Sequence, residues 1–243
     1  MTKSEPCDIL EWDSNFFGFR VGRVRGNTLT KSLIGQVEEW SLHNKIRCLY
    51  FLADSDNFET THLAEEQGFH LVDVRMTFER RLKTPIPSSN QILRPAEPDD
   101  MPELERMAHA GFAQTRFFYD SGFPHDLVKA LYAIWITRDF KDPLTTVLVA
   151  ASPESRPLGF VSLRHASGAE EAQISLVGVD EAARGKGTGQ ALIDGALAWA
   201  VQRGASSVIV VTQGRNVPAQ RLYQRSGFLT RSVELWYHKW YSD

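Results

Sequence analysis

Residues 174–199, ISLVGVDEAARGKGTGQALIDGALAW, decide the fold because they join a strand, a glycine turn and a helix. Ile174–Val179 is apolar and is typical of a buried strand, whereas Arg184–Gly189 is basic and rich in glycine. Apolar residues then recur at helical spacing: Leu192, Ile193, Ala196, Leu197, Ala200 and Val201. The stretch therefore predicts a strand that leads through a tight turn into an amphipathic helix.

The glycine turn has the chemistry of an anion site. Gly185, Gly187 and Gly189 remove Cβ atoms where the helix begins, so several backbone N–H groups and the positive end of the helix dipole converge there. Arg184 and Lys186 add full positive charge. The turn therefore favours a phosphate-bearing ligand. The alternative is a glycine-rich connection with two solvated basic side chains.

Spacing separates the known phosphate-binding turns. A P-loop requires Ser or Thr directly after its lysine, but Gly187 follows Lys186. A dinucleotide-binding turn requires a third glycine three residues after the second, but Gln190 stands three residues after Gly187. Both patterns are excluded. Arg184-x-x-Gly187-x-Gly189 remains, directly after a strand that ends in Val-Gly-Val-Asp.

This pattern resembles the pyrophosphate-binding motif of the GNAT superfamily of N-acetyltransferases. The resemblance implies acetyl-CoA as cosubstrate, without a metal, and a strand whose exposed backbone pairs with the pantetheine arm. In that arrangement the N–H of Val177 polarises the thioester carbonyl. The residues that the resemblance assigns to acetyl-CoA are Leu176, Val177, Val179, Arg184, Gly185, Lys186, Gly187, Thr188, Gly189 and Asn216.

Composition limits the classes of partner. The chain has 243 residues, 42% hydrophobic, with a formal charge of −3, which argues against a general nucleic-acid or membrane-surface binder. Cys7 and Cys48 are too few for a disulfide framework. No signal peptide and no apolar run near the ~20 residues of a membrane helix is evident. We expect a cytoplasmic protein that acts on a small molecule, and a homodimer stays open.

The first third of the chain echoes the last. Shifted by 159 positions, Arg47–Arg80 falls on Ser206–Lys239. Any strand-helix-strand unit needs a cap, a stop and a buried aromatic, but the match favours a degenerate half-copy of one fold. Ala64 stands where Tyr223 stands, so the catalytic candidate does not repeat. The aligned pairs are Asn57 and Asn216, Leu63 and Leu222, Gly68 and Gly227, Phe69 and Phe228, and Val74 and Val233.

A proline- and serine-rich break at Thr84–Asn90 predicts two domains. Residues 1–88 form a partial GNAT-like domain, and residues 91–243 form the catalytic GNAT domain. The order of expected elements indicates an α/β fold with a central mixed sheet flanked by helices. Apolar alternation at Phe17, Phe19 and Val21 predicts an early strand. Asp100 and Glu103 predict a capping box at a helix start.

Tyr223 is the catalytic candidate. Asn216 suits an N-cap and Gly227 a helix stop, and the seven residues from Asn216 to Tyr223 make about two turns, so both lie on one face. In the family, a tyrosine at this place protonates the leaving thiolate. A phenol with a reference pKa near ~10 keeps its proton at neutral pH until the sulfur becomes basic. The alternative is a packing tyrosine. Glu170 and Glu171 are weaker candidates for a general base.

Segments along the whole chain are similar to the dTDP-fucosamine acetyltransferase family, which implies the amine of a nucleotide-linked amino sugar as acceptor. These segments are Trp12–Gly18, Gly111–Phe117, Ala133–Ile136 and Gly159–Arg164. The loop at Gly111–Asp126 is then a substrate-facing loop, or else one that only covers apolar packing. Its substrate-binding candidates are Arg116, Phe117 and Tyr119. Alternatives are acetylation of a protein N-terminus or a small amine, and a non-catalytic acyl-CoA sensor.

Overall fold

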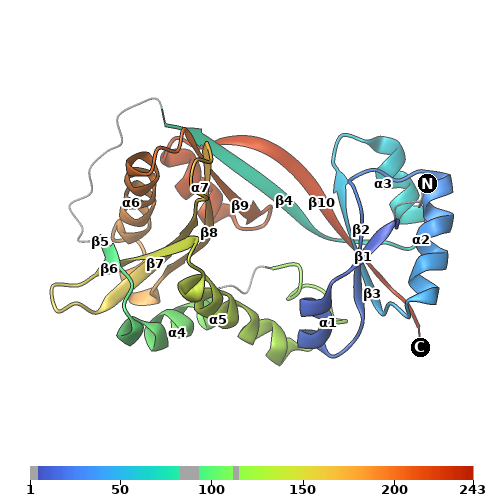
Figure 1. The fold of residues 1–243 in the computed structure, drawn as a ribbon, viewed down its shortest axis with the longest axis horizontal. Helices are drawn as coiled ribbons and strands as arrows, with labels where there is room; N and C mark the ends of the chain where they lie inside the picture. Colours follow the sequence, from blue (N-terminus) through green and yellow to red (C-terminus); the bar gives the residue numbers. More distant parts are fainter. Residues whose placement is uncertain (1–4, 83–92, 112–114, 243) are drawn as a thin grey trace.

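The computed structural model describes residues 5–82, 93–111 and 115–242. Within them, one ten-stranded mixed sheet runs through the molecule in the order β1-β2-β3-β10-β4-β9-β8-β7-β6-β5 (Figure 1). The strands are β1 Cys7–Ile9, β2 Val21–Val24, β3 Cys48–Asp54, β4 His70–Arg81, β5 Leu93–Pro95, β6 Thr145–Ala151, β7 Pro157–Arg164, β8 Glu171–Val179, β9 Ser207–Gln213 and β10 Leu229–Trp240. The α-helices are α1 Glu11–Phe17, α2 Lys31–His43, α3 Phe58–Glu66, α4 Met101–Gly111, α5 His125–Lys141, α6 Thr188–Gln202 and α7 Val217–Arg225.

The predicted α/β class and mixed central sheet are confirmed, and three local predictions are wrong. Phe17 ends helix α1 and Gly18 closes it with a φ of +79°, so the early strand begins only at Val21. Leu10 caps α1 without a side-chain hydrogen bond, so no capping residue marks the start of this helix in the sequence. The capping box joins Glu97 and Asp100 in a short 3₁₀ turn before α4, one turn earlier than expected.

Val201, expected on the buried face of α6, is exposed. The helix ends at Gln202, one residue later, and its last buried residues are Trp199 and Ala200. The predicted domain boundary at 84–90 lies outside the described residues.

Two strand-helix-strand units coincide when one is shifted by 159 positions. The unit β3-α3-β4 has element bounds 48–54, 58–66 and 70–81, and β9-α7-β10 has bounds 207–213, 217–225 and 229–240. In both units an asparagine side chain caps the helix: Asn57 accepts from the N–H of Thr60 at 3.0 Å, and Asn216 accepts from the N–H of Ala219 at 3.3 Å. The echo in the sequence therefore corresponds to an echo in backbone structure.

The two units exchange their last strands. Strand β4 pairs with β9 of the other unit, β10 pairs with β3, and β4 and β10 pair with each other in antiparallel fashion across the middle of the molecule (Figure 1). Arg75 lies opposite Glu234, and these residues are themselves 159 positions apart. The bulges of this pair skip Val72 and Arg231, which are again 159 apart. A pseudo-two-fold axis therefore passes between Arg75 and Glu234.

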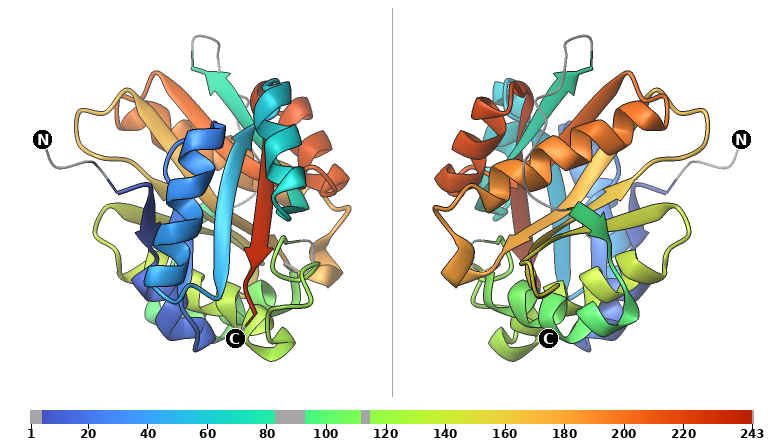
Figure 2. Two further views of the ribbon diagram at one scale, coloured as in Figure 1. Left: turned by 90° about the vertical axis from the view of Figure 1, so that its right-hand side faces the viewer. Right: turned by 90° about the vertical axis from the view of Figure 1, so that its left-hand side faces the viewer.

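Helices cover both faces of the sheet. One face carries α6 and α7 over the C-terminal half and α2 and α3 over the N-terminal half, and the opposite face carries α1, α4 and α5 (Figures 1 and 2). The core beneath α1, α4 and α5 is shared by the two halves, because Phe17 and Tyr50 pack there with Leu131 and Phe160. The halves are thus joined by strand exchange and by a common apolar core.

The ion pair on the pseudo-two-fold axis gives a test of this exchange. Glu234 accepts from both Arg75 and Asn27 and is largely buried. Glu234→Gln leaves the Arg75 charge uncompensated, so we expect a loss of about 1–3 kcal/mol in the free energy of unfolding, measured with urea. The control Glu79→Gln breaks the exposed pair with Arg81 on the same strand and should cost less than about 0.5 kcal/mol. Equal losses would contradict a special role for the axis pair.

Candidate active site

Strands β8 and β9 separate halfway along their length. Their parallel pairing runs from Glu171 with Ser207 to Ile174 with Val210 and ends there. Beyond that point β8 continues against β7 up to Val179, and β9 continues against β4 up to Gln213. The pairing of the sheet therefore has a wedge-shaped gap between β8 and β9, called the opening below. It lies at the residues that the family resemblance assigns to a pantetheine arm.

A buried hydrogen-bond network fixes this opening. The register between β7 and β8 shifts at Ser175. The Ser162 hydroxyl accepts a hydrogen bond from the N–H of Leu176 at 3.0 Å. The same hydroxyl donates to the carboxylate of Asp139 on α5 at 2.7 Å. The N–H of Asp180 also points to β7, where it donates to Leu158. Since successive N–H groups of a strand face opposite edges, those of Val177 and Val179 face the opening.

The glycine turn lies beside the opening. Gly185 and Gly187 have φ values of +74° and +87°, a region that favours glycine, and Gly187 begins α6 without a side-chain cap. The first N–H groups of α6 are thus left for a ligand, next to the exposed side chains of Arg184 and Lys186. Thr188 is buried at the first position of the helix.

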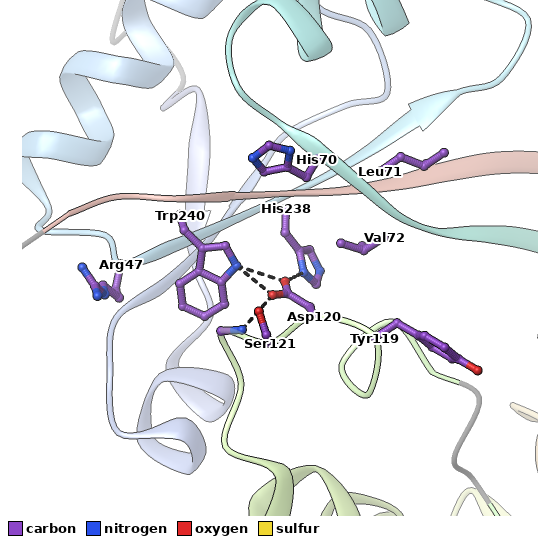
Figure 3. Close-up of a pocket in the computed structure, with 10 residues that line it drawn as sticks. Arg47, His70, Leu71, Val72, Tyr119, Asp120, Ser121, His238 and Trp240 are labelled. Atoms are coloured by element: carbon purple, nitrogen blue, oxygen red, sulfur yellow. Dashed lines mark hydrogen bonds and ion pairs between the residues drawn. The ribbon is translucent and has the colours of Figure 1, made fainter.

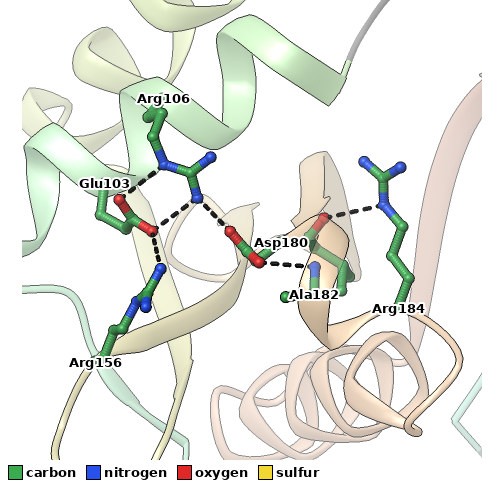
Figure 4. A network of polar contacts seen from close by, with 7 residues as sticks. Glu103, Arg106, Arg156, Asp180, Ala182 and Arg184 are labelled. Atoms are coloured by element: carbon green, nitrogen blue, oxygen red, sulfur yellow. Dashed lines mark hydrogen bonds and ion pairs between the residues drawn. The ribbon is translucent and has the colours of Figure 1, made fainter.

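A network of charged side chains holds the turn against α4 (Figure 4). Asp180 accepts from the N–H of Ala182 at 2.9 Å and pairs with Arg106, which also donates to Glu103. Hydrogen bonds lower the pKa of Asp180, so it is ionised and caps the short 3₁₀ turn before Arg184. Arg184 donates to the carbonyl of Val179 at 3.3 Å. The turn is therefore tied to the end of β8.

Helix α7 packs next to the turn and carries Tyr223. A Cβ built on Gly189 would lie 3.3 Å from Leu222 and 3.8 Å from Val179, so β8, α6 and α7 meet at this glycine. Tyr223 is buried between Phe78 and Phe228, and burial raises its pKa well above the ordinary value. Its phenol is therefore protonated at neutral pH. The side-chain oxygen of Asn216 accepts a hydrogen bond that caps α7.

The described part of the loop between α4 and α5, residues 115–124, packs onto the N-terminal half of the sheet. The Arg116 guanidinium lies over three rings, 4.5 Å from Tyr50, 4.5 Å from Phe117 and 3.8 Å from Trp236. Phe117 is buried in the shared core, whereas Tyr119 is exposed and stacks with Arg215 at 4.0 Å. Of the three substrate-binding candidates, Tyr119 is the one open to solvent.

Asp120 clamps this loop to β10 (Figure 3). Its carboxylate accepts from His238 Nδ1 at 2.6 Å, from Trp240 Nε1 at 3.0 Å and from the N–H of Gly122 at 3.0 Å. Burial lowers the pKa of His238 to about 4, so the ring is neutral at pH 7 and donates Nδ1–H to Asp120. Burial acts to raise the pKa of Asp120, but these hydrogen bonds lower it below its ordinary value.

Two further polar residues, Asp73 and Arg215, lie near this loop, and Asp73 was not singled out from the sequence. Asp73 is buried on β4, and burial raises the pKa of its carboxyl to about 6 although Arg215 and Arg116 lower it. Arg215 precedes the cap of α7 and donates to the carbonyl of Val72 at 3.1 Å. A lone carboxylate in the apolar run LVDVRMTF was the available signal for Asp73. Glu171, a candidate general base from the sequence, pairs with Arg231 at the end of β8 that is still paired with β9.

The described residues show neither a metal-binding cluster nor a membrane-spanning helix. They contain no group of three or more His, Cys, Asp or Glu side chains placed to hold a metal ion. None of their helices combines the length and apolarity needed to cross a bilayer.

Residues 109–228 match the model of the Acetyltransferase (GNAT) family. Over 234 residues the chain is 31% identical to dTDP-fucosamine acetyltransferase of Escherichia coli O6:H1 (strain CFT073), covering 95% of this chain and 96% of that protein. The chain belongs to the GNAT family of acetyltransferases. GNAT enzymes use acetyl-CoA, the cosubstrate expected from the glycine turn.

Three further proteins are similar to this GNAT enzyme, one in sequence and two in structure. Mycothiol acetyltransferase of Arthrobacter sp. (strain FB24) is 31% identical over 106 residues, 42% of this chain and 32% of that one. A GCN5-related N-acetyltransferase from Sphaerobacter thermophilus superposes with a TM-score of 0.70 at 19% identity, over 96% of this chain and 76% of that one. A tandem GNAT protein from the clavulanic acid pathway gives 0.61 at 14% identity, over 92% and 76%. These structures support the fold.

The clamp predicts a pH dependence of stability. His238 has a folded pKa of about 4, below its unfolded value of 6.5, so the unfolded state takes up its proton first on acidification. This group alone should lower the free energy of unfolding by about 2 kcal/mol between pH 7 and pH 5. His238→Asn keeps a donor for Asp120 but cannot titrate, so its stability should fall less over that range in urea titrations at each pH. Parallel pH profiles for the two proteins would contradict a buried neutral His238.

Proposed function

We propose that this enzyme transfers the acetyl group of acetyl-CoA to the amine of a nucleotide-linked amino sugar. The observation that carries the transfer is the meeting of three features at Gly189: the open edge of β8, the uncapped start of α6 and the tyrosine helix α7. The acceptor class rests on the similarity to a dTDP-fucosamine acetyltransferase, which extends over both halves of the chain.

The reaction we infer is a direct attack. The neutral amine of the acceptor adds to the thioester carbonyl, and negative charge grows on its oxygen. The N–H of Val177 faces the opening and would donate to that oxygen, and the same edge would pair with the pantetheine amides. The carbon–sulfur bond then breaks, the amine nitrogen loses a proton, and coenzyme A leaves as a thiol.

Tyr223 is our candidate for the acid that protonates the departing sulfur. It is buried beside apolar rings, and burial raises its pKa, so its proton is retained until a thiolate forms nearby. Asn216 acts indirectly: it caps the helix that carries Tyr223 and so helps to position that tyrosine. Arg184, Lys186 and the backbone from Gly185 to Gly189 would hold the pyrophosphate.

We also infer that residues 1–88 are a degenerate partial GNAT-like domain and residues 91–243 the catalytic one. The helix α2 corresponds in order to α6, but Thr30 caps it by accepting from the N–H of Leu33 at 3.2 Å. A helix start satisfied by its own side chain offers fewer donors to a phosphate. The role we assign to the N-terminal half is to support the loop that faces the acceptor.

The first test combines acceptor and acid. Thiol release from acetyl-CoA is measured with dTDP- and UDP-linked amino sugars, for the native chain and for Tyr223→Phe. We expect turnover of at least one sugar and a kcat about 10² to 10⁴ times lower in the variant, with the KM for acetyl-CoA unchanged. The control Tyr237→Phe removes the hydroxyl of another buried tyrosine, which donates to Glu65 in the N-terminal half. Turnover only of peptides or small amines would overturn the sugar assignment.

The second test addresses the glycine turn. Gly187→Ala places a Cβ on a residue with a φ of +87°, which strains the backbone by about 1–2 kcal/mol and tilts the first N–H groups of α6. We expect the KM for acetyl-CoA to rise about tenfold, with kcat changed less than about threefold. Gly204→Ala, at a φ of +80° beyond the other end of α6, is the matched control and should leave this KM unchanged. A normal KM in Gly187→Ala would remove the turn from the binding site.

A further inference from the structure

A cavity of about 520 Å³ lies between the two halves, away from the glycine turn. Its walls come from β4, β10 and residues 119–122 of the loop between α4 and α5 (Figure 3). The rings of Tyr119 and Trp240 and the side chain of His70 line it, and Leu71 is exposed beside it. The volume and the mix of aromatic and polar walls suit a ligand of nucleoside size.

Buried polar atoms without partners in the described part of the chain lie on His238 in the cavity wall and on Tyr50 and Arg116, which are stacked behind it. His238 is fully buried, its Nδ1 is engaged by Asp120, and its Nε2 has no hydrogen-bond partner among the described residues. Because the ring is neutral, Nε2 is an acceptor. Tyr50 stacks on this ring at 4.6 Å, and its hydroxyl, like Nη1 of Arg116, also lacks a partner there. An unpaired buried polar atom is costly, so such a group is suited to a ligand that completes its hydrogen bonds.

Arg215 links the cavity to the catalytic helix. Its guanidinium stacks on Tyr119 at 4.0 Å and donates to the carbonyl of Val72, and both residues belong to the cavity wall. The next residue, Asn216, caps α7, and Tyr223 follows seven residues later, about 10 Å along the helix axis. A cation therefore lies at the cavity wall and directly before the helix that carries the candidate acid.

We propose that this cavity and Arg215 together bind the nucleoside diphosphate part of the acceptor. The base lies against Tyr119 and Trp240, the phosphates contact Arg215, and the sugar extends along α7 so that its amine reaches the thioester. Arg116 adds positive charge on the inner side, and both arginines act electrostatically on the buried carboxyl of Asp73. This inference rests on the proposed function, since it names the part of the site that recognises the nucleotide.

The test measures binding without catalysis. The whole protein is saturated with coenzyme A to block the glycine turn, and dTDP and thymidine are titrated by calorimetry. We expect Arg215→Gln to weaken dTDP about tenfold or more and to change thymidine less than twofold, because only dTDP carries phosphates. The control Arg221→Gln removes an exposed arginine from α7, with the same change in net charge, and should leave dTDP binding unchanged.

A second variant tests the cavity itself. Leu71→Trp enlarges an exposed side chain at the rim and should weaken both dTDP and thymidine about tenfold, with acetyl-CoA binding unchanged. If both variants bind dTDP as the native chain does, the inference is overturned, even when an amino sugar is acetylated. Binding of dTDP that responds to both variants supports the cavity site even when no sugar is turned over, and only the proposed function then falls.

Discussion

The antiparallel pairing of β4 with β10 is the constraint on which the rest of the structure depends. Each strand leaves its own half and completes the sheet of the other, so β9, which pairs with β8 along one edge, has a partner along its other edge only because the N-terminal half supplies β4. Since unpaired backbone groups at a buried strand are costly, neither half of the sheet is complete alone. This explains why an N-terminal half with a capped, glycine-poor helix start remains part of an enzyme: the catalytic half needs its strand.

The same pairing builds two different surfaces from one repeated unit. On the catalytic side, β8 leaves β9 at Ile174 and an uncapped helix begins beside the gap. On the other side, Thr30 closes the corresponding helix start, and β10 instead presents His238 and Trp240 to the loop from the catalytic half. In the proposed function, one half thus offers backbone donors to the cosubstrate, and the other half holds the loop expected to meet the acceptor. This difference between the two halves follows from local helix caps and charged side chains on a backbone that the two halves share.

The sequence predicts the fold where local chemistry decides it. Periodicity and caps located β8, α6 and α7 within a few residues, and the echo of 159 positions anticipated two equivalent units. Helix α1 was missed because no capping side chain marks its start. The clamp of Asp120 on His238 joins residues 118 positions apart, and no local pattern reports such a contact. Strand exchange was also beyond prediction, because β3 and β9 are both mainly apolar strands and no local pattern tells which of them β4 pairs with.

The most direct test of the account is hydrogen exchange, followed by mass spectrometry, with and without acetyl-CoA. The open edge of β8 and the start of α6 should receive the cosubstrate, so peptides covering residues 176–190 should exchange more slowly when it binds. Peptides covering residues 22–33, the corresponding region of the N-terminal half, should not change. Protection of both regions, or of residues 22–33 alone, would contradict the assignment of a single cosubstrate site to the catalytic half.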